Sequence, residues 1–225
     1  MRTLRLGLSL VVGLCVLLST GCLIIGANSG IQGSGQAASE ARDVGSFQKI
    51  AVAGSLDVDV TFGPTHSVKV ETDDNLIDLV QTENESGTLK INVRESCNPR
   101  SGMKVHIVMP ALEACDFLGS GSVSIAKIEA ERFQAKLLGS GHLTADGVVD
   151  HLSAKILGSG EADLEGVVAQ DADASVLGSG TLRIRAEKTL NIEVLGSGDV
   201  IYSGSATPTK TNTLGSGSIR RSDEP

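Results

Sequence analysis

A four-residue sequence, Leu-Gly-Ser-Gly, recurs six times in the second half of this 225-residue chain. Its leucine stands at positions 118, 138, 157, 177, 195 and 214, so successive copies are 20, 19, 20, 18 and 19 residues apart. A repeat of this length is typical of solenoids, in which each unit buries its apolar face only by stacking on its neighbours. The repeat therefore predicts a stack of similar coils.

Apolar and polar residues alternate on both sides of each Leu-Gly-Ser-Gly corner. Val123 and Ile125 follow the first corner, and Phe133, Ala135 and Leu137 precede the second. A period of two indicates β-strands with one buried face. Equivalent strands of successive coils must run parallel. The predicted fold class is therefore all-β, a parallel β-helix of about 19 residues per coil, and we expect it to be right-handed like most parallel crossovers.

The corner residues themselves fit sharp bends. Glycine adopts positive φ without a steric penalty, and serine hydroxyls satisfy nearby backbone groups in turns. We expect the leucine before each corner to form an internal ladder. The stacked serine hydroxyls leave a second interpretation open, a column that binds a ligand.

The strand pattern extends upstream with less regularity. Regular coils are predicted for residues 113–220, and irregular coils of the same solenoid for residues 46–112, where Gly54-Ser55 is similar to a degenerate corner. Residues 75–80 fit either a short helix or a further strand. Aromatic residues make up only 2% of the chain, so the core must consist mainly of Val, Ile, Leu and Ala.

The N-terminus carries the pattern of a targeting signal. Arg2 and Arg5 precede an apolar run over residues 6–18 and then Ser19-Thr20-Gly21-Cys22, which fits a signal peptide better than a membrane span of about 20 residues. The ending resembles a bacterial lipobox, although Ser19 replaces the usual Leu. The resemblance implies a lipoprotein signal over residues 1–21 and lipidation of Cys22. An ordinary secretory signal and an uncleaved anchor are the alternatives.

The residues after Cys22 bear on sorting and on flexibility. Leu23, rather than Asp, follows the cysteine, which in Gram-negative lipoproteins implies the outer membrane. Residues 22–45 are rich in Gly, Ser, Ala and Asn, a composition that predicts a flexible tether.

Several short segments resemble a known family. Phe47-Gln48-Lys49-Ile50, Val58-Asp59-Val60, Asn75-Leu76 and Leu89-Lys90-Ile91, followed by the Gly-Ser-Gly repeats, are similar to the head-GIN domain family of auto-transporter adhesins. The resemblance covers about residues 44–220, and we assign residues 46–225 to this domain. It implies a β-helical domain on secreted or lipid-anchored bacterial envelope proteins, a role in adhesion, and no catalytic residues to carry over.

Cys97 and Cys115 are the remaining cysteines downstream of Cys22. An oxidising envelope favours a disulfide between them. Cys115, however, falls in the inward register that Ala135 and Ala154 fill in later coils, where a buried free thiol also fits. A free pair therefore stays open, as does a metal or catalytic role.

Stacking would align outward residues of successive coils in two columns. The first contains Ser122, His142, Glu161, Thr181 and Asp199, and the second contains Ser124, Thr144, Asp163, Arg183 and Ile201. His142, Glu161 and Asp163 could converge as metal ligands or as an acid/base pair acting on polysaccharide. The alternative is a solvated face on which Asp163 pairs with Arg183.

Other polar residues are weaker candidates for a metal site. Asp57 and Asp59 lie on one outward strand face and Asp73-Asp74 at a turn, where clustered oxygens could hold Ca²⁺. We expect His66, His106 and His151 to be surface residues without partners at ligand spacing.

The composition of the chain excludes some classes of partner. A net charge of −8 and the scarcity of aromatic residues argue against nucleic acid as a partner. The prediction is a non-enzymatic, lipid-anchored envelope protein without a cofactor, bound to the membrane through its lipid, whose β-helix displays an adhesion or scaffold surface for an envelope glycan or protein. A polysaccharide-active β-helix enzyme is the alternative, and a periplasmic regulatory module is a third hypothesis.

Overall fold

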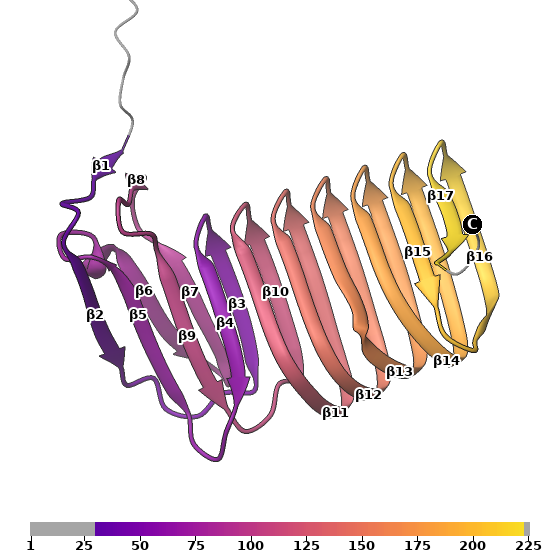
Figure 1. Cartoon of the computed structure of the whole chain (residues 1–225), viewed down its shortest axis with the longest axis horizontal. Helices are drawn as coiled ribbons and strands as arrows, with labels where there is room; N and C mark the ends of the chain where they lie inside the picture. The colour runs from indigo at the N-terminus through magenta and orange to yellow at the C-terminus, as the bar shows by residue number, and fades with distance from the viewer. Residues whose placement is uncertain (1–29, 223–225) are drawn as a thin grey trace, which may run out of the picture.

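The computed structural model of the chain describes residues 30–222 as an elongated stack of strands (Figure 1). The strands are β1 (Ile31–Gln32), β2 (Ala37–Arg42), β3 (Lys49–Gly54), β4 (Asp57–Phe62), β5 (Ser67–Asp73), β6 (Val80–Glu85), β7 (Thr88–Val93), β8 (Cys97–Asn98), β9 (Lys104–Met109), β10 (Ala114–Gly119), β11 (Ser122–Gly139), β12 (His142–Gly158), β13 (Glu161–Gly178), β14 (Thr181–Gly196), β15 (Asp199–Ser203), β16 (Thr207–Gly215) and β17 (Ser218–Arg221). A short 3₁₀ helix, η1 (Ile77–Leu79), leads into β6, which begins at Val80. The short helix and the strand that were predicted as alternatives for residues 75–80 are therefore both present. The predicted all-β solenoid of stacked parallel coils is confirmed.

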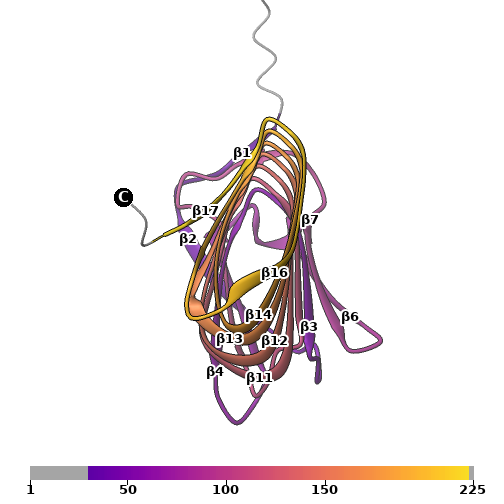
Figure 2. The same ribbon diagram turned by 90° about the vertical axis from the view of Figure 1, so that its right-hand side faces the viewer.

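Strands β11 to β14 each run through almost a whole coil. They pair parallel with their neighbours, and the corners fall in register, so that Leu118, Leu138, Leu157, Leu177 and Leu195 stack on one another. All corners therefore lie along one edge of the stack, which we call the corner edge, at the top of Figure 1. Seen along the stack, each coil is a flattened loop with a narrow corner and a wider bend opposite, which we call the far bend (Figure 2).

Each loop has two sheet layers. The pre-corner sheet contains the strand segments that end in a corner, with β6 added at its first edge, in the order β6, β7, β3, β10, the second halves of β11 to β14, and β16. The post-corner sheet contains the segments that follow a corner, with β2 and β5 added at its first edge, in the order β2, β5, β9, β4, the first halves of β11 to β14, β15 and β17.

The two glycines of a corner are required for different reasons. Gly158 has φ +126°, and a Cβ there would lie 2.5 Å from the carbonyl oxygen of Gly139 in the preceding coil. A Cβ at Gly160 would lie 2.7 Å from Cδ2 of the buried Leu137. The first glycine therefore provides both the backbone conformation and the clearance, whereas the second provides clearance alone.

The core between the layers is aliphatic, as predicted. Cys115 stacks on Ala135, Ala154, Ala174 and Ile192 in one inward column, and all five are buried. The largest fully buried side chains are Phe47, Phe117 and Phe133. Phe117 and Phe133 lie in β10 and β11, where the regular coils begin.

The corner leucines, by contrast, face outward, so the predicted internal leucine ladder is wrong. Leu118 is 55% exposed and Leu214 is 69% exposed, whereas Leu137 and Ile156, each one residue before a corner leucine, are buried. Because successive side chains of a strand point to opposite faces, the buried register of Leu137 forces Leu138 to the outside.

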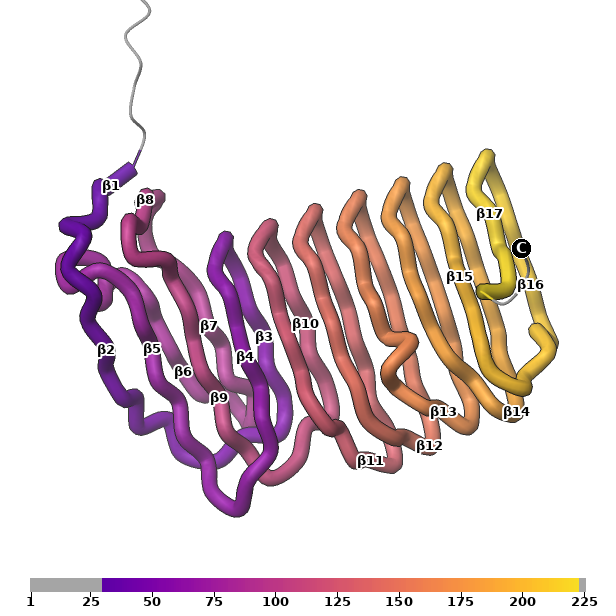
Figure 3. Tube along the Cα trace, viewed as in Figure 1, coloured from indigo at the N-terminus to yellow at the C-terminus, as the bar shows by residue number. Residues whose placement is uncertain are grey.

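The first coils do not follow the order of the chain. Strands β7 and β9 form a coil that stacks beneath β3 and β4, because β7 pairs parallel with β3 and β9 pairs parallel with β4. The chain then passes back to begin β10 on the opposite side of β3 (Figure 3). Residues 46–112 therefore contain two coils, and the predicted degenerate corner at Gly54 is in register with Gly119.

Three further strands at this end pair antiparallel, which the prediction of irregular coils did not include. β6 pairs with β7, β5 pairs with β9, and β2 pairs with β5. Together these strands close the first end of the stack and cover edges that would otherwise be open to association. Residues 37–42 form β2, so the prediction of a flexible tether over residues 22–45 is wrong for this segment.

A buried carboxylate holds the N-terminal segment in place. Asp73 accepts hydrogen bonds from the N–H of Gly35 (2.7 Å), the N–H of Arg100 (2.7 Å) and the hydroxyl of Ser101 (2.9 Å). Burial by itself raises the pKa of Asp73, but the hydrogen bonds from Arg100, Ser101 and Gly35 lower it, and the net pKa lies below the ordinary 3.8. The charged form of Asp73 therefore links three separate segments of this end.

Candidate functional site

The outward side chains of the post-corner sheet form two continuous columns. The register confirms both predicted columns, with His142 opposite Glu161 and Asp163 opposite Arg183. The columns also extend into the first coils, because Ser122 lies opposite Asp57 and Ser124 opposite Asp59. We call this surface the polar face. Its first column is Glu71, Lys104, Asp57, Ser122, His142, Glu161, Thr181, Asp199 and Ser218, and its second is Lys69, His106, Asp59, Ser124, Thr144, Asp163, Arg183, Ile201 and Arg220.

Glu161 is the centre of the cluster predicted from the sequence. Its carboxylate pairs with the guanidinium of Arg183 and lies 3.7 Å from Nδ1 of His142. Asp163 instead accepts a hydrogen bond from the N–H of Glu165, at 3.2 Å, within its own strand. The predicted cross-coil ion pair therefore exists, but its acid is Glu161 and not Asp163. The long side chain of Arg183 reaches diagonally across the sheet, as cross-strand neighbours two residues apart permit.

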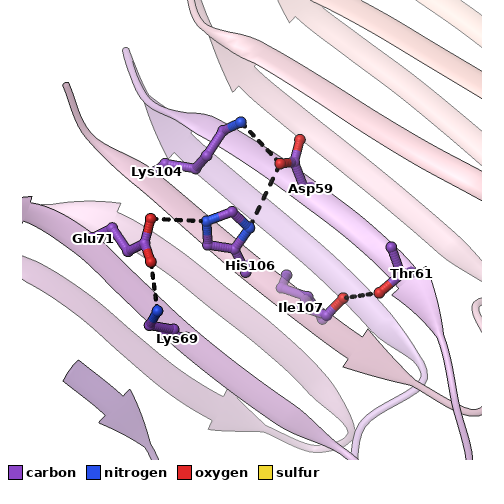
Figure 4. Close-up of polar contacts among 7 residues, drawn as sticks. All are labelled: Asp59, Thr61, Lys69, Glu71, Lys104, His106 and Ile107. Atoms are coloured by element: carbon purple, nitrogen blue, oxygen red, sulfur yellow. Dashed lines mark hydrogen bonds and ion pairs between the residues drawn. The ribbon is translucent and has the colours of Figure 1, made fainter. Parts of the chain in front are cut away.

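A second charged network lies on the same face, on β4, β9 and β5 (Figure 4). Asp59 lies 2.9 Å from Nζ of Lys104 and 3.5 Å from Nδ1 of His106. The other ring nitrogen of His106 lies 3.1 Å from Glu71, which also pairs with Lys69 at 2.5 Å. The imidazole of this surface residue thus bridges two carboxylates on neighbouring strands, a pair of contacts that the spacing of residues along the chain did not indicate.

The network also shifts the pKa of two of its members. The hydrogen bond from Lys69 lowers the pKa of Glu71, and His106 lowers it further. The hydrogen bond to Asp59, together with its charge, raises the pKa of Lys104. Each shift favours the charged form of its group, so Glu71 and Lys104 both carry a charge at neutral pH.

The other two histidines also have neighbours. His151 lies on the surface, as expected, and its Nε2 is 3.2 Å from Asp173 on the pre-corner sheet. His66 lies against the backbone of Phe47, with Nε2 2.8 Å from the carbonyl oxygen. The contact of His151 joins two neighbouring coils, and that of His66 forms at the first end of the stack. Neither contact could be predicted from the spacing of residues within one strand.

The carboxylates of Asp57 and Asp73, which were considered as Ca²⁺ ligands, accept hydrogen bonds from other groups of the protein. Asp57 accepts hydrogen bonds from the N–H and hydroxyl of Ser122, at 3.0 and 2.6 Å, and Asp73 is the buried link described above. Within residues 30–222, no group of three or more His, Cys, Asp or Glu side chains is arranged to hold a metal ion.

Two grooves lie on the pre-corner side of the stack. The larger, of about 850 Å³, is lined by residues that include Lys49, Glu113, Glu131 and Arg132. The smaller, of about 300 Å³, is lined by residues that include Lys155, Asp173, Asn191 and Glu193. Neither groove is lined by any residue of the predicted cluster, so the cluster projects from a sheet surface.

The cysteines are free thiols in the structure, and the predicted disulfide is wrong. Cys97 lies in β8, which pairs with β1, whereas Cys115 points into the core from β10. Burial, with a contribution from Asp116, raises the pKa of Cys115 to about 12, and burial also raises the pKa of Cys97. Low thiolate content is typical of structural rather than catalytic cysteines. The predicted lipidation site, Cys22, lies outside the described residues.

Comparison with solved structures shows where this fold occurs. The chain is 22% identical to an adhesin candidate from Bacteroides fragilis, with a TM-score of 0.71 over 85% of this chain and 100% of that one. It is also 22% identical to a protein from Parabacteroides distasonis described as a "putative lipid binding protein", with a TM-score of 0.57 over 86% of this chain and 99% of that one. A second P. distasonis protein, described as a "putative adhesin", is 19% identical and has a TM-score of 0.55, over 86% of this chain and 100% of that one. These similarities support the fold.

No curated protein sequence matches the chain. A family model described as "Putative auto-transporter adhesin, head GIN domain" matches residues 46–206. This range includes the two out-of-order coils, the covering antiparallel strands β5 and β6, and the coils up to β15. The protein belongs to the head GIN domain family.

Proposed function

We propose that this protein is a non-enzymatic, lipid-anchored protein of the bacterial cell envelope, and that its polar face is an adhesion or scaffold surface. The observation that carries the proposal is the continuity of that face. It crosses nine strands from β5 to β17, and at about 4.8 Å per strand it extends roughly 38 Å.

The chemistry of the polar face suits an extended polar partner. Carboxylates, basic groups and hydroxyls occur along its whole length, interrupted by the buried Ile201, and Asp59, Glu161 and Arg183 are all partly exposed. Such a surface offers hydrogen-bond donors and acceptors at the spacing of the strands. We expect the partner to be an envelope glycan or an extended protein segment, either of which can contact many strands at once.

The family and the sequence support the location. The family description names adhesins, and the lipobox-like ending at Cys22 supports lipidation, with Leu23 supporting the outer membrane. Within residues 30–222 the structure has no helix that is long and apolar enough to cross a bilayer.

A binding assay with matched variants tests the role of the polar face. The test variant carries His142→Ala, Glu161→Ala and Arg183→Ala, which remove one carboxylate, one guanidinium and one imidazole. The control carries Lys155→Ala, Ser175→Ala and Glu193→Ala on the outward side of the pre-corner sheet, which remove one carboxylate, one ammonium group and one hydroxyl. Immobilised mature protein is incubated with intact bacterial cells, peptidoglycan and lipopolysaccharide.

The test variant should bind the retained probe about tenfold more weakly, and the control should bind like the unaltered protein. Equal binding by all three proteins would refute the polar face as the binding surface. Loss of binding in the control alone would instead assign binding to the smaller groove. Turnover of any polysaccharide by the unaltered protein would favour the enzymatic alternative.

Two measurements test the location. Mass spectrometry of the N-terminal peptide should find lipid on Cys22, and protease added to intact cells shows whether the domain faces the medium. An unmodified Cys22, or a retained signal segment, would overturn the lipid anchor.

A further inference from the structure

The six corner leucines form an apolar row on the outside of the solenoid. We call this row the leucine ridge, and it consists of Leu118, Leu138, Leu157, Leu177, Leu195 and Leu214. The two ends are 55% and 69% exposed, and the inner four are partly exposed between their neighbours. Five intervals of about 4.8 Å give the ridge a length of roughly 24 Å. A continuous outward apolar row of this kind marks an interaction surface.

The six Leu-Gly-Ser-Gly corners are free of ionisable residues, unlike the far bends, whereas the turn after β7 at the first end of the same edge carries Arg94 and Glu95. All six Leu-Gly-Ser-Gly corners lack acids and bases, although 20% of the chain is charged. The far bends of β11, β12 and β14 each carry at least two ionisable residues, such as Lys127 with Glu129 and Arg185 with Glu187, and that of β13 carries Glu165. The regular coils are therefore amphipathic from edge to edge, with their uncharged side at the corners.

The N-terminal end of the described chain lies at this same edge. β1 pairs with β8 near the level of the corners, at the top of Figures 1 and 3. Seven residues, 23–29, separate Cys22 from Gly30, the first described residue, and the eight steps from Cα to Cα span at most about 28 Å. A lipid on Cys22 would therefore hold the corner edge, rather than the far bends, close to the bilayer.

We propose that the leucine ridge lies in the interfacial region of the bilayer that holds the lipid anchor. This inference rests on the proposed lipidation of Cys22. The long axis of the solenoid then lies parallel to the membrane, with the leucines among the headgroups and upper acyl chains, as for other interfacial apolar surfaces. Both sheets then stand upright on the bilayer, and the far bends point away from it. Because the ridge lacks lysine and arginine, we expect its contact to be nearly insensitive to salt.

The natural chain has no tryptophan, so a single introduced tryptophan reports on one position. Leu157→Trp places the reporter on the ridge. Val148→Trp is the matched control, since Val148 is an outward apolar residue at the far bend and is 56% exposed. Ser159→Trp, at an exposed corner residue, is a second ridge reporter should Leu157→Trp not fold by circular dichroism.

The lipidated full-length mature protein is reconstituted in vesicles of phosphatidylethanolamine and phosphatidylglycerol, with and without lipids brominated high on the acyl chain. The protein should float with the vesicles. Bromine should lower the emission of the ridge reporter about twofold and leave Val148→Trp unchanged. The quenching should persist at 0.5 M NaCl, about three times physiological ionic strength.

The outcomes separate the ridge from the anchor. Flotation without quenching of either ridge reporter would overturn the ridge contact and leave the lipid anchor standing. Equal quenching of the ridge and far-bend reporters would overturn the proposed orientation. Emission that shifts with protein concentration rather than with lipid would assign the ridge to a second copy of the chain, which also overturns the proposal. Failure to float would overturn both the anchor and the inference built on it.

Discussion

A methyl group added at Gly178 should destabilise the solenoid strongly, because two costs coincide there. Gly178 has φ +125°, and its added Cβ would lie 2.4 Å from the carbonyl oxygen of Gly158 in the preceding coil. That oxygen already accepts a hydrogen bond from the N–H of Ser179, at 2.9 Å. The methyl group therefore cannot be accommodated without separating two coils that are hydrogen-bonded together.

The expected magnitude follows from these two costs. A non-glycine residue at positive φ costs on the order of 1–3 kcal/mol, and overpacking against a fixed backbone costs about 1–3 kcal/mol more. We therefore expect Gly178→Ala to lower the free energy of unfolding by about 4 kcal/mol. Gly87→Ala is the control, since Gly87 has φ +81° but no atom within 4 Å of the added Cβ. It should cost only about 1–2 kcal/mol.

Guanidinium unfolding of the mature protein, followed by far-ultraviolet circular dichroism, measures the difference. The transition midpoint of Gly178→Ala should fall by roughly 0.5–1 M, and that of Gly87→Ala by about a quarter to a half of this. Because a solenoid can unfold in segments, the slope of each transition is compared as well. Equal destabilisation by the two substitutions would refute close approach between coils as the reason for the glycine.

Three further predictions concern the core, the thiols and pH. Leu152→Ala, at a fully buried position, should lower the free energy of unfolding by about 2–5 kcal/mol, and a loss below 1 kcal/mol in the same assay would contradict a packed core. Cys115 should resist iodoacetamide at pH 8 in the folded protein, because its pKa is about 12. Mass spectrometry should find Cys97 and Cys115 both alkylated only in denaturant, and a persistent disulfide between them would contradict the prediction. Asp73, whose pKa is lowered on folding, contributes stability that is complete above its ordinary pKa of 3.8 and is lost as pH falls through the lower folded value. Hydrogen-exchange protection of β2 should therefore decrease when the pH is lowered below about 3.8. Asp73→Asn should show reduced protection of β2 already at pH 7. Unchanged protection in both experiments would contradict the role of Asp73 in holding the N-terminal segment.

The outward columns of the regular coils could be predicted because they depend on only two periodicities. Alternation along a strand separates inward from outward residues, and the 18- to 20-residue repeat aligns them between coils. His142 and Glu161 accordingly lie opposite one another. The same alternation already placed Leu137 inside and Leu138 outside. The corner leucines were wrongly assigned to the core because they are apolar, although the residue before each of them already points inward.

The ion-pair partners on these columns could not be predicted from register alone. Arg183 lies opposite Asp163 in the ladder, yet its guanidinium pairs with Glu161. The length of the arginine side chain allows either contact, and the local hydrogen bond from Glu165 to Asp163 favours the diagonal one. Side-chain reach and competing backbone donors decide such pairs, and neither follows from residue spacing.

The sequence by itself determined the stacked coils, their parallel strands, the position of each corner and most of the buried residues. These features repeat, and each copy needs only its neighbours for its apolar face to be buried. The tertiary structure alone decided the order of the first coils, the antiparallel strands that close the stack, and the pairing of His106 with Asp59 and Glu71. Those features depend on contacts between segments that do not repeat, where several pairings satisfy the same alternation and only the packing of the whole end selects one.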